Sequence, residues 1–118
     1  MPQNDPDPEP GLPATAPVFA ALGDRTRLTI VATLSAGDPR SISALADTSD
    51  LTRQAVTKHL KVLEGAGLVQ SRRIGRETVY SFEGEALAGA CAQLDAIARQ
   101  WQGALGRLKQ HVEDDADS

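Results

Sequence analysis

The sequence contains a single cysteine, Cys91, and has no long hydrophobic run. One cysteine excludes an intramolecular disulfide and any metal cluster built from several cysteines of one chain, and it suits a reducing compartment. No apolar stretch approaches the roughly 20 residues of a membrane-spanning helix. The first ten residues are acidic and rich in proline, whereas a signal peptide would be basic and then apolar. We therefore expect a cytoplasmic protein.

Aromatic residues are also scarce, at 3% of 118 residues, although hydrophobic residues make up 41%. A core of this composition consists mainly of Leu, Ile, Val and Ala, which favours helices, and the length suits one domain. The sequence lacks the patterns typical of enzyme sites: a nucleophile paired with a base, a glycine-rich phosphate loop, or two carboxylates at useful spacing. We expect neither enzymatic activity nor a cofactor.

Basic residues are absent from both ends of the chain. The net charge of −4 argues at first against contact with phosphates. However, residues 1–15 and 112–118 carry seven acidic residues and no Lys or Arg, whereas residues 52–80 carry six Lys or Arg and only two acidic residues. A basic segment of this kind is the electrostatic footprint of a nucleic-acid-binding protein, although clustering of this size also occurs by chance.

Composition divides the chain into three parts. Residues 1–15 hold five prolines among acidic and small residues, too few apolar groups to offset the entropy of ordering. We expect a disordered tail at 1–15, one folded domain at 16–112, and an acidic disordered tail at 113–118.

Capping residues predict the helices of the domain. Asp24 caps a helix with Leu28, Val31 and Leu34 on one side, which Gly37 and Pro39 end. Ser41 caps a short helix that turns Ile42, Leu45 and Ala46 inward, and Asp50 can then take a left-handed turn conformation. Thr52 caps a longer helix that ends near Ala66 and Gly67. Two helices joined by a short turn indicate a helix-turn-helix.

The hydrophobic period changes after Gly67. Residues 68–74 and 78–82 alternate and flank residues 75–77, which include Gly75. This pattern predicts a β-hairpin with glycine in its turn, a wing that spans about residues 69–82.

The helix over residues 52–65 has two distinct faces. Val56, Leu60 and Leu63 form its inward stripe, and polar side chains of the types that bond base edges project on the other side. A solvated polar face is the simpler alternative, but the adjacent arginine-rich hairpin favours DNA. The predicted DNA-binding residues are Thr52, Arg53, Gln54, Thr57, Lys58, Lys61, Arg73 and Arg76.

The segment from about Glu85 to Val112 has heptad spacing, which is typical of a long helix with a helical partner. We expect this helix to form the interface of a homodimer. The predicted interface residues are Leu87, Cys91, Leu94, Ala98, Trp101, Leu105 and Leu108, with Val112 continuing the series.

Three motifs resemble those of the ArsR/SmtB repressors. They are ALGDRTRL at 21–28, LTRQAVTKHLKVLEGAGLV at 51–69 and RIGRETVY at 73–80, and the similarity covers about residues 17–112. It implies a mostly helical winged helix-turn-helix with a small β-hairpin. It also implies a dimer formed by the first and last helices, and an operator bound by the helix after Thr52.

Many members of that family sense metals, but this chain lacks both ligand sets expected from the resemblance. One set is a Cys-x-Cys, where this chain has Ser41 and Ser43, and hydroxyls are poor ligands for thiophilic metals. The other needs Asp-x-His on the last helix, where this chain has Ala98 and Gln100. His111 and Asp114 match only half of that site, and zinc takes four ligands. We expect no metal site.

Three other side chains have two interpretations each. Cys91 is either an inert small hydrophobe or a redox switch near a twofold axis. His59 packs or contacts phosphate, and Trp101 packs in the core or interface rather than lining a ligand pocket. For the whole protein, the alternative to a DNA-binding regulator is a winged-helix protein–protein module, which would not need basic residues on both helix and hairpin.

Overall fold

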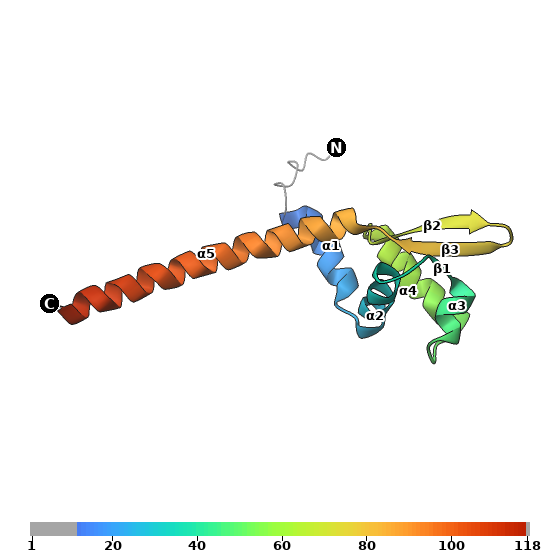
Figure 1. Cartoon of the computed structure of the whole chain (residues 1–118), viewed down its shortest axis with the longest axis horizontal. Coiled ribbons are helices and arrows are strands. Elements are labelled where there is room, and N and C mark those ends of the chain that lie inside the picture. Colours follow the sequence, from blue (N-terminus) through green and yellow to red (C-terminus); the bar gives the residue numbers. More distant parts are fainter. Residues whose placement is uncertain (1–11, 118) are drawn as a thin grey trace, which may run out of the picture.

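The computed structural model describes residues 12–117, where it shows a mostly helical chain with a small antiparallel sheet. The elements are α1 (Leu12–Leu22), α2 (Arg25–Ser35), β1 (Arg40–Ser41), α3 (Ile42–Asp47), α4 (Arg53–Gly65), β2 (Val69–Ile74), β3 (Glu77–Phe82) and α5 (Gly84–Asp117). Helices α1–α4 and the sheet form a body from which α5 extends (Figure 1). The predicted winged helix-turn-helix architecture is confirmed.

Both predicted tail boundaries need correction. Helix α1 begins at Leu12, inside the segment expected to be disordered, and Thr15 is already buried. Proline is tolerated in the first turn of a helix, so Pro13 does not prevent this start. At the other end α5 continues to Asp117. Near this end the side-chain amide of Gln110 donates a hydrogen bond to the carboxylate of Asp114, one helical turn further along. Residues 1–11 and Ser118 lie outside the described part of the chain.

The three predicted N-caps are confirmed. The Asp24 carboxylate accepts the Arg27 amide at 3.0 Å, and this bond is the main reason that the pKa of Asp24 lies below its ordinary value. The Ser41 hydroxyl accepts the Ala44 amide at 3.1 Å. Thr52 accepts the Ala55 amide at 3.0 Å. Each cap satisfies one amide of a first helical turn and thereby fixes where α2, α3 and α4 begin.

The prediction of a left-handed Asp50 is wrong. Among residues 12–117 only Gly67 and Gly75 have positive φ. Ser49 shapes the turn between α3 and α4 instead, because its hydroxyl accepts the Leu51 amide at 3.3 Å and donates to the Ala46 carbonyl at 3.3 Å. A serine side chain that bonds the backbone in this way makes a left-handed residue unnecessary.

The core forms where α2, α3 and α4 meet the sheet. The predicted stripe of α4 is confirmed, since Val56, Leu60 and Leu63 are at most 1% exposed. In α2 two of the three predicted inward residues, Val31 and Leu34, are confirmed, and Leu28 is not. Ile30 is buried with Val31 and Leu34, and Leu28 is 52% exposed.

Helix α4 ends in a Schellman motif. Gly67 takes φ +79°, its amide bonds the Glu64 carbonyl, and the Leu68 amide bonds the Leu63 carbonyl, both at 3.0 Å. Leu63 and Leu68 are both fully buried. This termination turns the chain from α4 directly into β2 and sets the position of the wing relative to the helix.

The sheet has the strand order β1-β3-β2 and is antiparallel throughout. Ile74 pairs with Glu77, so the hairpin turn consists of Gly75 and Arg76, and Glu77 lies in β3 rather than in the turn. Gly75 has φ +61°, which fits a type II′ turn with glycine at its first central position. The sequence did not predict β1, whose two residues are too few for a periodic pattern.

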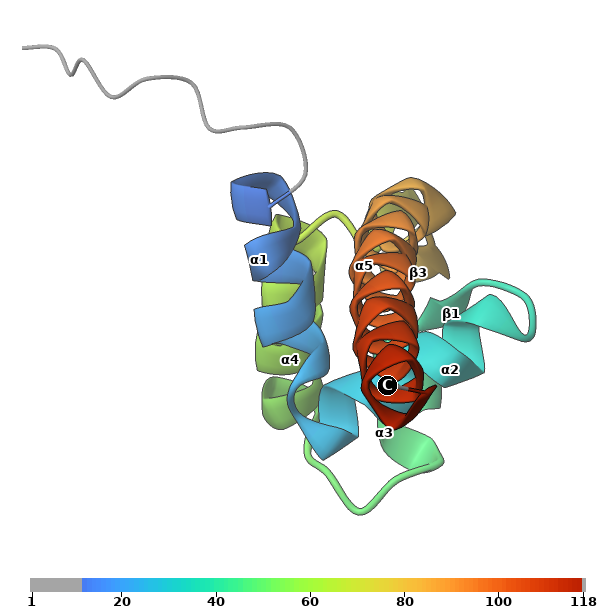
Figure 2. The same cartoon turned by 90° about the vertical axis from the view of Figure 1, so that its left-hand side faces the viewer.

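The first and last helices pack against each other. Val18 and Ala21 of α1 and Ala90 of α5 are buried, and Leu87 is half-buried against the core. Figure 2, viewed nearly along α5, shows α1 beside it. The C-terminal part of α5 extends away from the body (Figure 1). None of the helices within residues 12–117 is long and apolar enough to cross a membrane.

Candidate nucleic-acid interface

The predicted contact residues of α4 lie on its solvent side. Arg53, Gln54, Lys58 and Lys61 are exposed, as is the cap residue Thr52. Thr57 is half-buried, and its hydroxyl donates to the Arg53 carbonyl at 2.7 Å. The proton of Thr57 is therefore in use, and its hydroxyl can only accept a bond from a base or a water.

The arginine side chains of the wing are accessible to solvent. Arg72, Arg73 and Arg76 are exposed, and no ion pair holds any of them within the described chain. Arg72 pairs across the hairpin with Val79, and Arg73 with Thr78. Because neighbouring residues of a strand point to opposite faces, the hairpin has a guanidinium on each side.

Helix and wing meet at a shallow depression near the start of α4. It has a volume of about 140 Å³, and Arg53 of α4 and Arg76 of the hairpin turn both line it. Ser41 and Ser43 line it too. A second depression of about 480 Å³ joins Ile42 to the predicted contact residues Arg53, Gln54, Thr57 and Lys58. The fold thus brings two of the predicted arginines, 23 positions apart in sequence, to one surface.

The orientation of α4 depends on a polar cluster that the sequence did not predict. The Arg27 guanidinium donates to the Ala21 carbonyl at 2.7 Å and lies 3.4 Å from Nδ1 of His59. His59 Nδ1 is 3.9 Å from the Asp24 carboxylate. These contacts join the end of α1, the start of α2 and the middle of α4. His59 therefore packs against α2, one of its two predicted roles.

A second polar contact joins the end of α4 to the wing. The Ser71 hydroxyl donates to a carboxylate oxygen of Glu64 at 2.8 Å. Burial raises the pKa of Tyr80, and the negative charge of Glu64 raises it further. Tyr80 is therefore neutral over the physiological range. It lies in β3, the central strand of the sheet. The Ser71–Glu64 bond thus links the wing to the end of α4.

The outer part of α5 exposes an apolar face. Leu94, Trp101, Leu105, Leu108 and Val112 are 44–62% exposed, and Ile97, which the prediction omitted, is 47% exposed. The predicted residues Cys91 and Ala98 are also exposed. Leu87 alone of the predicted set packs on the core of its own chain.

Three of the side chains considered as metal ligands, Ser41, His111 and Asp114, make other contacts in the structure. Ser41 caps α3. His111 lies 3.5 Å from Asp115, while Asp114 bonds Gln110. Within residues 12–117 no three His, Cys, Asp or Glu side chains are grouped as metal ligands would be.

Comparison with known proteins identifies the family. A helix-turn-helix domain model matches residues 22–72. The repressor SmtB of Mycobacterium tuberculosis is 33% identical over 100 residues, which cover 85% of this chain and 72% of the relative. The chain belongs to the ArsR/SmtB family of transcriptional regulators.

Two solved structures agree with this assignment. An ArsR-like regulator from Rhodococcus sp. RHA1 is 39% identical and covers 83% of this chain and 92% of its own, with a TM-score of 0.74. A homodimeric winged helix-turn-helix DNA-binding domain from Mycobacterium bovis is 30% identical. It covers 75% of this chain and 82% of its own, with a TM-score of 0.59.

Proposed function

We propose that this ArsR/SmtB regulator binds operator DNA in the cytoplasm as a homodimer and represses the adjacent genes. The observation that carries the proposal is the exposed basic surface that α4 and the wing form together. Arg53 and Arg76, from separate elements, line one depression on it, and Lys58 and Lys61 extend the charge along α4. A protein–protein module would not need cations on both elements.

We assign different contacts to the two elements. The start of a recognition helix reaches base edges in the major groove, so Arg53, Gln54, Thr57 and Lys58 are placed to select the sequence. Thr52 lies beside the phosphates at the helix start. Lys61, Arg73 and Arg76 lie farther along the helix and on the wing, where contacts go to phosphates or to the minor groove.

The apolar face of α5 supports a dimer. Leu94, Ile97 and Trp101 have about half of their surface exposed in the single chain, and water contact with so much apolar area is costly. A second α5 would cover this face, and α1 would lie at its edge because it packs against α5. A twofold dimer binds two half-sites about 34–36 Å apart, so we expect a palindromic operator.

Selection from a library of random duplexes tests the proposal without knowledge of the operator. Full-length protein should enrich a palindrome whose halves are one helical turn apart, and sedimentation should show two chains on each selected duplex. As a control, a Gln54→Ala, Lys58→Ala variant should enrich no common sequence although it remains dimeric. Enrichment of no sequence by the parent protein would contradict the proposal and favour the protein–protein module.

A further inference from the structure

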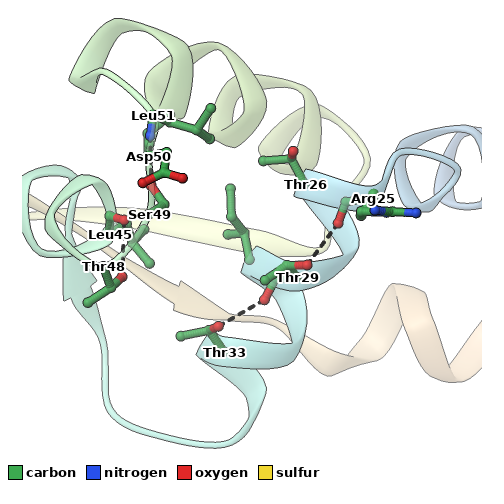
Figure 3. A pocket seen from close by; sticks show the side chains of 11 residues that line it. Arg25, Thr26, Thr29, Thr33, Leu45, Thr48, Ser49, Asp50 and Leu51 are labelled. Atoms are coloured by element: carbon green, nitrogen blue, oxygen red, sulfur yellow. Dashed lines mark hydrogen bonds between the residues drawn. The ribbon is translucent and has the colours of Figure 1, made fainter.

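A cavity of about 320 Å³ lies between α2 and the turn that leads into α4, and it shares no lining residue with the two depressions at the predicted DNA-contact residues. Ile30 of α2, Leu45 of α3 and Val56 of α4 provide apolar walls, and Leu51 lines it from the turn. Figure 3 shows the side chains of α2 facing those of the turn across it. The volume lies at the lower end of the range of about 300–1,000 Å³ that is typical of small-molecule sites.

Five hydroxyl groups line the cavity, and four of them, all except that of Thr26, already donate their protons to the backbone. Thr29 donates to the Arg25 carbonyl and Thr33 to the Thr29 carbonyl, both at 2.9 Å, as the dashed lines of Figure 3 show. Thr48 donates to the Leu45 carbonyl at 3.1 Å. A hydroxyl whose proton is in use offers only lone pairs. These four hydroxyls therefore accept hydrogen bonds and have none to give.

One acidic and one basic side chain line the cavity. Asp50 lines it from the turn, and within residues 12–117 its carboxylate has no hydrogen bond and no ion pair. Arg25 also belongs to the lining, but Figure 3 shows its guanidinium directed away from Asp50, on the far side of α2 from the turn. A ligand in the cavity would therefore meet apolar walls, hydroxyl acceptors and one unpaired carboxylate.

We infer that this cavity binds a small apolar amine in its protonated form. The ammonium would donate to Asp50 and to the threonine hydroxyls, and the hydrocarbon part would lie against Ile30, Leu51 and Val56. An anion would be repelled by the Asp50 carboxylate, and a neutral ligand would gain no charge pairing with it. The ligand would touch both α2 and α4, so its binding would change how α4 is held. On the proposed function, this makes the amine an effector of DNA binding.

An NMR titration of the full chain without DNA tests binding by itself. The probes are 2-phenylethylamine, 2-phenylethanol and phenylacetate, which share a ring but differ in charge and hydrogen-bonding capacity. The amine should bind most tightly and shift the amides of Thr29, Thr33 and Leu51. Equal affinity for phenylacetate, or amine-induced shifts confined to other parts of the chain, would overturn the inference.

Two matched variants isolate the carboxylate. Asp50→Asn keeps the shape of the side chain and removes its charge. It should lower the affinity for 2-phenylethylamine about three- to fivefold, an effect of the size expected for an exposed ion pair. The affinity for 2-phenylethanol should not change. Asp47→Asn makes the same charge change at an exposed position outside the cavity and should leave both affinities unchanged. Equal effects of the two variants would show that only net charge matters, which would exclude the site.

The effect on DNA is measured separately. On a duplex selected by the parent protein, saturating 2-phenylethylamine should weaken binding, and by linkage the duplex should weaken amine binding by the same factor. Thr29→Trp, at an exposed position of α2, should fill the cavity and abolish the response without abolishing DNA binding. If no duplex is bound even without amine, the proposed function fails while the titration still tests the cavity. If DNA binding is normal and the amine does not change it, the effector role fails.

Discussion

Helices α4 and α5 are both amphipathic, but their apolar faces have opposite environments. In α4 the apolar stripe of Val56, Leu60 and Leu63 is at most 1% exposed. In α5 the large apolar residues from Leu94 onward are 44–62% exposed. Helix α4 completes its packing within one chain, so its polar side chains are free to face DNA. Helix α5 has an exposed apolar face, which a second α5 would cover in the proposed dimer.

The sharpest test of this comparison truncates one leucine on each helix. Leu60→Ala should lower the free energy of unfolding by about 2–5 kcal/mol, because it leaves a cavity in the core. This loss should not depend on protein concentration. Leu108→Ala, at a position 59% exposed, should lower stability only where the chains are paired. Chemical denaturation at several protein concentrations measures both, and a concentration-independent loss for Leu108→Ala would place its packing inside one chain.

A charge on the outer face of α5 should prevent dimerisation. Leu94→Asp would place a carboxylate between two apolar helices and should cost about 2–4 kcal/mol of association, the range of a central interface residue. Sedimentation should show monomers at micromolar concentration. Operator affinity should fall although no residue of α4 has changed, because two half-sites require two linked chains. Asp95→Asn, which alters a charge at an exposed neighbour, is the control and should leave the dimer intact.

Substitutions on α4 should alter sequence preference while the dimer persists. Arg53→Ala and Gln54→Ala should each cost about 1–3 kcal/mol on the operator and relax the preference at particular base pairs, because each removes a contact to base edges. Repeating the duplex selection with each variant shows which positions become degenerate. If each variant lost the same affinity for operator and for scrambled DNA, these residues would contact phosphates rather than base edges.

The end of α4 offers a smaller test of how the wing is positioned. Gly67→Ala should lower stability by about 1–2 kcal/mol, because its φ of +79° is costly for any residue with a Cβ. Gly65→Ala is the matched control. A Cβ there would meet nothing within 4 Å, and alanine favours the helix. Thermal unfolding should show opposite shifts for the two variants.

Local rules predicted the helix-turn-helix because its boundaries depend on nearby residues. Ser41 and Thr52 are N-caps in the sequence and in the structure, and the periodicity of α4 identified its buried face correctly. The ends of the chain were less predictable. Proline and acidic composition suggested disorder at 12–15 and 113–117, whereas α1 and α5 extend through these residues.

The sequence was less informative about residues whose environment depends on tertiary contacts. Leu28 fits a helical stripe as well as Ile30 does, and only the position of the neighbouring helices selects Ile30 for the core. The cluster of Asp24, Arg27 and His59 joins residues more than 30 positions apart, which no local pattern reveals. Asp24 and Arg27 lie in one of the family-like motifs and His59 lies in another, but neither motif indicates that the three side chains meet. No sequence pattern predicts the cavity beside Asp50 either.

The last and smallest effect separates wing contacts from general electrostatics. Arg76→Gln should weaken operator and scrambled duplexes alike, by about 1 kcal/mol or less at physiological salt, and should lower the slope of log affinity against log salt by about one unit. One fewer phosphate contact releases one fewer counterion, and it carries no sequence information. Arg107→Gln removes the same charge from an exposed position on α5 and should leave the slope unchanged. If both variants lower the slope equally, the wing has no phosphate contact at Arg76 and acts only through the net charge of the chain. If Arg76→Gln instead relaxes sequence preference, the wing arginine reaches base edges, and the division of roles between α4 and the hairpin has to be redrawn.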